Sequence, residues 1–251
     1  MAFGSELVSA NGFVISSMPI GESDRRIEVL TRELGKVSAF VRGGAKPRSP
    51  LLAATNPFFF GEFEFFAGSS SYTLRSARQK ARFDDLLKDL DDTYMGMYIL
   101  EVAGYFGREG IDEKDRLNLV YAALKALIRH EVKRESIRII YDLRTMMVNG
   151  VYPDAFSCRA CGKRLDVNAI NLFCPADCFF YDCDCRDRIK GTARELSPAL
   201  LYTIQLIFSL PAGKLFSFDV NGQVLLDLEF IAKRLRAVFF EEHRFRTESF
   251  I

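Results

Sequence analysis

Six cysteines are the residues of this chain whose type and spacing point most directly to chemistry. Cys158 and Cys161 form a CxxC pair followed by a glycine. The others stand close behind it, at Cys174, Cys178, Cys183 and Cys185. A structural zinc ion needs four soft ligands that tight turns bring together, and four thiolates leave no open position for catalysis. The cluster therefore predicts a structural metal site, with a metal-free thiol cluster or a disulfide-linked secreted domain as the alternatives.

A stretch without carboxylates is the second feature that points to a function. Residues 34–61 contain no Asp or Glu, and the cations among them surround Gly43 and Gly44: Lys36, Arg42, Lys46 and Arg48. A flexible glycine loop of this kind can place cations and backbone N–H groups against phosphates, and Arg25 and Arg26 can extend the patch. The pattern predicts a nucleic-acid contact, with a solvated surface loop as the alternative.

Phe40 alternates with these basic positions. An aromatic ring there can offer a face on which a base of a single strand stacks. The stronger expectation from the sequence is that Phe40 packs in the core.

Residues suited to catalysis are few. The two histidines, His130 and His243, fall in expected charged helices and are interpreted as surface residues. Glu22 and Asp24 are close enough to form an acid pair, but the neighbouring arginines favour turn residues or ion-pair partners. The sequence contains no phosphate loop, dinucleotide fingerprint or HExxH motif. We therefore expect no enzyme.

Two kinds of structure are expected to position these residues. The first part of the chain has short runs suited to strands, separated by glycine-rich turns. Strands are expected near residues 8–15, 27–30, 37–41, 58–66 and 72–75. Five short strands in about 80 residues predict a small barrel such as an OB-fold.

The hydrophobic period changes near residue 80. Helices are expected over about 83–106, 117–128, 137–147, 197–210 and 225–243. Ser197 and Pro198 fit an N-cap and a first helical position. The predicted domains are a barrel over residues 1–80 and a helical domain over 81–251, with a cysteine-rich insert at about 156–188.

The composition limits the class of protein. The chain has 251 residues and a formal net charge of +1, so it shows no overall signature of a polyanion-binding protein. No apolar run approaches the roughly 20 residues of a membrane span, and the N-terminus lacks the order of a signal peptide. We therefore expect a cytoplasmic protein, in which reducing conditions keep thiols available for a metal.

Three segments of the first part of the chain form a recognisable pattern. They are residues 21–25 (Gly-Glu-Ser-Asp-Arg), 30–36 (Leu-Thr-Arg-Glu-Leu-Gly-Lys) and 42–49 (Arg-Gly-Gly-Ala-Lys-Pro-Arg-Ser). Together they resemble the N-terminal domain of RecO, a family of bacterial recombination mediators. Later features follow the family's order: Asn56-Pro57-Phe58, Tyr72-Thr73-Leu74, a helical part, the CxxCG insert and Ser249-Phe250-Ile251. The resemblance covers essentially the whole chain.

The resemblance implies an α+β fold: an N-terminal OB-fold barrel, then an α-helical domain with an inserted zinc ribbon. It also implies a nucleoid-associated bacterial protein that handles DNA without catalysis. Proteins of this family bind single- and double-stranded DNA and anneal complementary strands. They bind RecR and the acidic C-terminal tail of single-strand-binding protein, and with RecR they help to load RecA on coated single strands.

Carried onto this chain, the resemblance implies DNA contacts at five residues: Arg25, Lys36, Arg42, Lys46 and Arg48. The alternative is an adaptor that binds RecR and the acidic tail without strong DNA binding of its own. Its candidate cations are Arg129, Lys133 and Arg134, although a solvated helix end is the simpler interpretation of these residues.

The chain departs from the family at the metal site. Zinc-binding members close the ribbon with a second CxxC after a Gly-Gly turn, whereas the aligned stretch here reads Asp182-Cys183-Asp184-Cys185. Cys158, Cys161 and Cys185 keep their places as ligands of a structural Zn²⁺. Cys183 is the preferred fourth ligand because a thiolate is softer than a carboxylate. Asp182, Cys174 and Cys178 stay open as alternatives.

Overall fold

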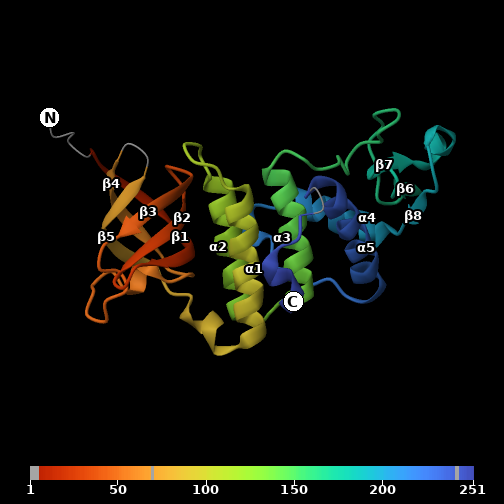
Figure 1. Cartoon of the computed structure of the whole chain (residues 1–251). Helices are drawn as coiled ribbons and strands as arrows, with labels where there is room; N and C mark the ends of the chain where they lie inside the picture. Colours follow the sequence, from red (N-terminus) through yellow and green to blue (C-terminus); the bar gives the residue numbers. More distant parts are fainter. Residues whose placement is uncertain (1–5, 69–70, 241–242) are drawn as a thin grey trace. The chain divides into compact units, whose positions relative to one another are not determined.

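The computed structural model describes residues 6–68, 71–240 and 243–251, and the chain divides into two compact units (Figure 1). The first unit contains residues 1–129 and 245–251, and the second contains residues 130–244. Strands give way to helices after Ala81, close to the predicted change of period. The first unit nevertheless also includes two helices and the C-terminal segment.

Five strands of the first unit close into a barrel in the order β1-β2-β3-β5-β4. They are β1 Glu6–Ile20, β2 Asp24–Thr31, β3 Lys36–Val41, β4 Phe60–Ala67 and β5 Tyr72–Ala81. The β3–β5 pair is parallel, and the other neighbouring strands are antiparallel. This arrangement confirms the expected OB-like barrel.

The first strand is longer than the sequence predicts because it pairs on both sides. Residues 6–13 pair with β4 and residues 12–20 pair with β2. A register shift between Val14 and Ser16 marks an irregularity of the kind that bends a strand and lets a barrel close. Alternate residues of the strands fill the barrel interior, including Ile27, Val29, Val37, Ala39, Val41, Phe63 and Phe65.

Two helices complete the first unit: α1 Leu90–Phe106 and α2 Lys114–Arg129. The apolar stripe from Phe83 predicted one longer helix. Instead a 3₁₀ turn, Asp84–Lys88, precedes α1, because the Asp89 carboxylate accepts a hydrogen bond from Asp92 N at 3.0 Å and begins a new helix. An aromatic cluster links the barrel and the helices of this unit. Its four rings all contact one another, and they belong to Phe13, Phe60, Phe83 and Tyr121.

The second unit packs three helices together with a small sheet (Figure 1). The helices are α3 Arg134–Val148, α4 Pro198–Ser209 and α5 Gly222–Phe239. The sheet has the order β7-β6-β8, with β6 Asn171–Cys174, β7 Phe179–Asp182 and β8 Arg194–Leu196. Ser197 caps α4 as predicted, since its side chain accepts a hydrogen bond from Leu200 N at 3.2 Å.

Charged residues inside the second unit hold its helices together. Asp142 on α3 and Arg236 on α5 form an ion pair at 2.8 Å, with side chains only 3% and 13% exposed. Arg144 on α3 donates to the carbonyl oxygens of Ile207 and Phe208 at the end of α4. Among the described residues, none of the helices is long and apolar enough to cross a membrane.

Candidate nucleic-acid interface and metal centre

The basic stretch folds as a hydrogen-bonded loop directly after β3; residues 42–49 are called the basic loop below. Its turns are closed by Gly44 N on Val41 O at 3.2 Å and Lys46 N on Gly43 O at 3.1 Å. Gly43 has a φ of 66°, which favours glycine. A Cβ on Gly44 would lie 2.8 Å from a Val41 methyl group. The glycines therefore allow tight hydrogen-bonded turns in a loop that the sequence analysis expected to be flexible.

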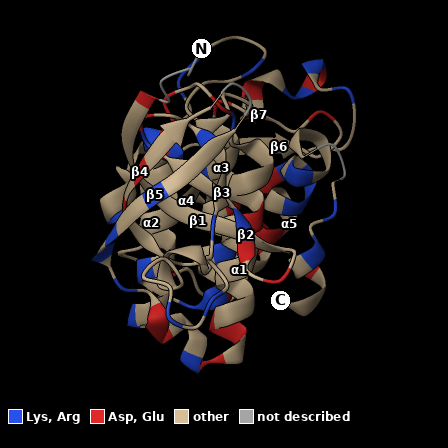
Figure 2. Cartoon of the chain, turned by 60° about the vertical axis from the view of Figure 1, so that its left-hand side comes forward, with Lys and Arg blue, Asp and Glu red and all other residues tan. Residues whose placement is uncertain are grey.

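Three of the predicted DNA contacts project from this loop. Arg42, Lys46 and Arg48 are all exposed, and Figure 2 marks the Lys and Arg positions of the chain in blue. Within the described part of the chain, no carboxylate forms an ion pair with any of the three. Their charges are therefore available to a phosphate backbone.

The turn between β1 and β2 anchors the basic loop. The Asp24 carboxylate accepts a hydrogen bond from Gly43 N at 2.7 Å, and the Ser23 carbonyl accepts one from Ala45 N at 2.9 Å. Asp24 thus acts as a turn residue, in agreement with the structural interpretation of the acid pair. This carboxylate orders the backbone of the loop that carries the three cations.

Replacing Asp24 with Ala is expected to weaken DNA binding several-fold although it removes a negative charge. The reason is that Gly43 N loses its acceptor and the loop loses order before binding. Asp24→Asn keeps an acceptor oxygen and removes the charge, so it should bind DNA at least as tightly as the wild type. Fluorescence anisotropy with a labelled oligonucleotide measures both variants. Tighter binding by Asp24→Ala than by Asp24→Asn would contradict the anchoring role.

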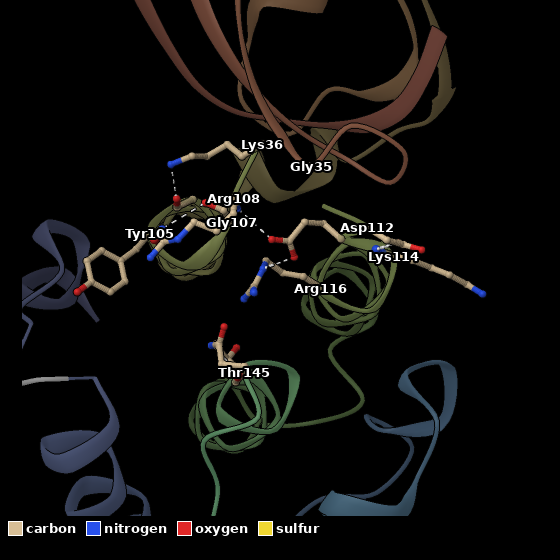
Figure 3. A network of polar contacts seen from close by, with 12 residues as sticks. Gly35, Lys36, Tyr105, Gly107, Arg108, Asp112, Lys114, Arg116 and Thr145 are labelled. Carbon is tan, nitrogen blue, oxygen red and sulfur yellow. Dashed lines mark hydrogen bonds and ion pairs between the residues drawn. The ribbon is translucent and has the colours of Figure 1, made fainter. Parts of the chain in front are cut away.

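The other two predicted DNA contacts are held by the protein itself. Arg25 donates from Nη1 to Ser17 Oγ at 3.2 Å, and its Nε is buried with no hydrogen-bond partner among the described residues. Lys36 directs its ammonium to the end of α1, where Nζ donates to the Gly104 carbonyl at 2.7 Å (Figure 3). Both side chains therefore have partners within the protein, and their role as DNA contacts stays a prediction.

Lys36→Met is expected to lower the free energy of unfolding by about 1–2 kcal/mol, because a charged hydrogen bond to a helix-terminal carbonyl is lost. It should lower DNA affinity much less than replacing any one cation of the basic loop does. Urea denaturation and an oligonucleotide titration on the same preparation give the two quantities. A large loss of affinity at unchanged stability would return Lys36 to the DNA contacts.

Phe40 lies on the outside of the barrel, so the expectation that it packs in the core is wrong. Its side chain is 39% exposed. The interior positions of β3 are the alternating Val37, Ala39 and Val41, which leaves the even positions outside. The guanidinium of Arg26 lies 5.9 Å from the centre of the Phe40 ring.

Phe66 and Arg75 form a similar pair that the sequence reasoning missed. Phe66 is 37% exposed, and the guanidinium of Arg75 lies 5.8 Å from its ring centre. A signal for Phe66 was present: Phe65 and Phe66 are adjacent in a strand, so their rings must face opposite sides of the sheet. Only one of them can fill the barrel interior.

Three of the predicted metal ligands come together in the second unit. The thiol sulfurs of Cys158, Cys161 and Cys185 all lie within 4.8 Å of one another. The first two stand on a tight knuckle, in which Gly162 N donates to the Cys158 carbonyl at 2.9 Å and Gly162 has a φ of 73°. Cys185 lies in the 3₁₀ turn Cys183–Arg188 that follows β7. The trio could bind a metal ion.

The electrostatics of the trio fit a cation. Burial alone would raise the pKa of the Cys158 thiol, but hydrogen bonds from the backbone N–H groups of Asp182, Cys161 and Ala160 outweigh burial and lower it. A hydrogen bond with Cys161, together with burial, raises the pKa of Cys185 to about 12. Ionisation of Cys158 is thus favoured, whereas ionisation of Cys185 is opposed by the neighbouring cysteines. A bound cation would stabilise both thiolates.

The remaining candidate ligands lie outside the trio. Cys183 is partly exposed, and its thiol lies 3.7 Å from Asp184 Oδ1. The buried Asp182 carboxylate pairs with Lys163 Nζ at 2.9 Å, and Lys163 holds the pKa of Asp182 below its ordinary value. Cys174 and Cys178 are buried at the β6–β7 turn, where Cys178 N donates to the Cys174 carbonyl at 2.8 Å. The Cys183 ligand therefore stays a prediction.

Neither histidine lies in a helix, contrary to the sequence expectation. His130 follows the end of α2 at Arg129, with a φ of 54°, and His243 follows α5, which ends at Phe239. Both are exposed.

Two family profiles together match most of the chain. The family profile described as "Recombination protein O N terminal" matches residues 5–83. The profile described as "Recombination protein O C terminal" matches residues 87–243. The two matches divide the chain close to the end of β5.

Individual relatives carry the same description. The DNA repair protein RecO of Alkaliphilus metalliredigens is 30% identical over 157 residues, which span 62% of this chain and 64% of that protein. The DNA repair protein RecO of Acetivibrio thermocellus is 26% identical over 227 residues, with 90% and 89% of the two chains covered. That of Moorella thermoacetica is 26% identical over 245 residues, with 98% and 90% covered. The chain belongs to the recombination protein O family of DNA repair proteins.

Proposed function

We propose that the chain is a DNA-binding recombination mediator that works without catalysis of its own. In this proposal the barrel binds single- and double-stranded DNA, and the protein anneals complementary strands at the bacterial nucleoid. Together with RecR it helps to load RecA on single strands coated by single-strand-binding protein. The observation that carries the proposal is the basic loop, where Arg42, Lys46 and Arg48 are exposed and form no ion pair with a carboxylate of the described residues.

The shape of the loop supports binding to a phosphate backbone rather than to a particular base sequence. Its cations stand on a turn held by Asp24 and Ser23, so little order has to be gained on binding. Contacts to phosphates fix a protein on DNA but carry no sequence information. The proposed activity therefore suits a protein that acts on any damaged site.

Partners are proposed to include RecR and the acidic tail of single-strand-binding protein. A cavity of about 340 Å³ in the second unit is lined in part by Lys133 and Arg134, two candidate cations of the adaptor alternative. Glu131, Glu135 and Asp219 line the same cavity. These carboxylates would repel an acidic peptide. The cavity is therefore weaker support for the adaptor alternative than the basic loop is for DNA binding.

A structural Zn²⁺ is proposed for the cysteine trio. Cys158, Cys161 and Cys185 would hold it, and Cys183 or Asp182, at the start of the turn that carries Cys185, would supply the fourth ligand. When bound, the ion would neutralise the thiolates and fix the knuckle and this turn relative to each other. We propose that the cysteine-rich insert is a stability element of the helical domain that begins after the barrel.

The experiment that tests the mediator proposal is annealing of complementary oligonucleotides coated with single-strand-binding protein. Fluorescence follows the reaction with and without the zinc-loaded chain at two salt concentrations. We expect acceleration that fades at high salt, because phosphate contacts are lost in proportion to counterion release. A folded sample that gives no acceleration but binds the tail peptide in calorimetry would favour the adaptor alternative.

A further inference from the structure

A single row of side chains runs around the outside of the barrel at one register. Met18 pairs with Arg26, Arg26 with Phe40, and Phe40 with Thr73 across the parallel pair of β3 and β5. Thr73 then pairs with Phe66, and Phe66 pairs with Leu7. The apolar members are all exposed: Met18 by 65%, Leu7 by 42%, Phe40 by 39% and Phe66 by 37%. Cross-strand pairing therefore places two exposed rings in one line.

A guanidinium group lies beside each of the two rings of this row. Arg26 lies over Phe40 and Arg75 lies over Phe66, at 5.9 and 5.8 Å from the ring centres. Only Thr73 on β5 separates the two rings, so their Cα atoms lie about 10 Å apart, or two strand spacings. The repeat of the same ring–guanidinium pair at this spacing suggests two equivalent contacts along one ligand.

The surroundings of the row favour an anion. The basic loop begins at Arg42, immediately after β3, the strand that carries Phe40. The nearby carboxylates accept hydrogen bonds within the protein and keep their charge: Glu28 from Ser16 Oγ at 2.8 Å, Glu64 from Ser76 Oγ, and Asp24 from Gly43 N. The row also lies near the β1–β2 and β4–β5 ends of the barrel, the part of this architecture that generally binds oligonucleotides.

We propose that Phe40 and Phe66 are stacking positions for two bases of one nucleic-acid strand, with the Arg26 and Arg75 guanidinium groups beside them. A duplex keeps its base faces stacked on one another, so only an unpaired strand can offer them to these rings. The row therefore makes the barrel favour single strands over duplex DNA. This inference rests on the proposed DNA binding and adds the residues that distinguish the two forms of DNA.

The competing occupant is a protein with an apolar segment. Such a contact depends on buried apolar area and tolerates Leu in place of Phe. Base stacking depends on the flat face of the ring and does not. The two occupants therefore differ in their response to Phe40→Leu and Phe66→Leu, and both side chains are exposed enough for the substitution to leave the core intact.

The chain contains no Trp, so a single introduced Trp reports on its own position. Phe40→Trp and Phe66→Trp are made separately in the full chain, with Tyr202→Trp on α4 as the matched control at a 56% exposed site. Each is titrated with oligothymidine and with an abasic phosphodiester strand of the same length. Stacking predicts that only oligothymidine quenches the indole fluorescence of the two barrel variants, and that the control does not change. Equal responses to both strands would overturn the proposal.

Affinities complete the test. Phe40→Ala, Phe66→Ala and the two Leu variants should each lose single-strand affinity by a factor of about ten, and duplex affinity by less than about twofold. Wild-type affinity for single strands in the Leu variants, or equal losses on single strand and duplex, would overturn the stacking positions. A wild-type protein that binds neither DNA would instead overturn the proposed function itself.

Discussion

Replacing Arg42, Lys46 and Arg48 together with Ala should lower single-strand affinity by one to two orders of magnitude at low salt. Each phosphate contact on a single strand contributes about 0.7 to the slope of log K against log salt, so losing three should flatten the slope by about 2. The effect should be similar for strands of any sequence, because phosphate contacts carry no sequence information. Anisotropy titrations at four or five salt concentrations measure the slope.

The matched control removes the same charge elsewhere. Lys190, Lys214 and Arg244 are exposed residues of the second unit. Their triple Ala variant has the same net charge as the basic-loop variant. If both variants flatten the salt dependence equally, DNA affinity depends on the overall charge of the chain. The basic loop would then not be the site of the phosphate contacts.

Cys185→Ser should abolish stoichiometric metal binding and open the cysteine-rich insert. Structural zinc in small sites contributes on the order of 10 kcal/mol of folding free energy, so few other single substitutions should have an effect as large. The loss should appear as zinc content near zero in metal analysis and as fast amide hydrogen exchange over β6 and β7. DNA affinity of the remaining folded protein should change far less than stability, because the basic loop belongs to the first unit.

Two further cysteine variants define the site. Cys174→Ala removes a buried thiol that lies outside the trio, so it should keep its zinc. Cys183→Ser tests the fourth ligand. When the variant is loaded with cobalt, a charge-transfer absorption reduced by the share of one thiolate would identify Cys183. An unchanged spectrum would exclude Cys183 and leave Asp182, Cys174 and Cys178 as the candidates. Zinc retained in Cys185→Ser would contradict the site as described.

The barrel could be predicted because its physical signals are local. Short alternating runs separated by glycine turns define strands, and five of them suggest a small closed sheet. The length of β1 could not be predicted in the same way. It depends on two different partners, β2 and β4, whose pairing is set by the closed barrel and not by β1 itself.

The five candidate DNA contacts fall into two groups, exposed residues of the basic loop and residues with partners inside the protein. The sequence does not separate these groups because it does not show long-range contacts. A sequence gives the charge of Lys36 but not the position of the Gly104 carbonyl, which lies far away in the chain and accepts its hydrogen bond. Lys36 was expected to contact DNA but bonds within the protein, whereas Phe40 was expected in the core but is exposed. Its register against Arg26 and Thr73 places it outside.

The metal site was predictable in part because three ligands belong to short knuckles with recognisable spacing. Cys158 and Cys161 share one knuckle, and Cys185 lies in the 3₁₀ turn Cys183–Arg188. The fourth position depends on which side chain of 182–183 turns inward. Asp182 is bound by Lys163, which the sequence places next to the first knuckle without showing this contact.

The measurement that tests the central claim most directly is photochemical crosslinking of the intact, zinc-loaded chain to a single-stranded oligonucleotide, followed by mapping of the crosslinked peptides. Binding through the barrel predicts crosslinks within residues 24–48 and 66–75, which contain the basic loop and the exposed rings. Crosslinks confined to residues 130–244 would place DNA on the second unit and contradict the account.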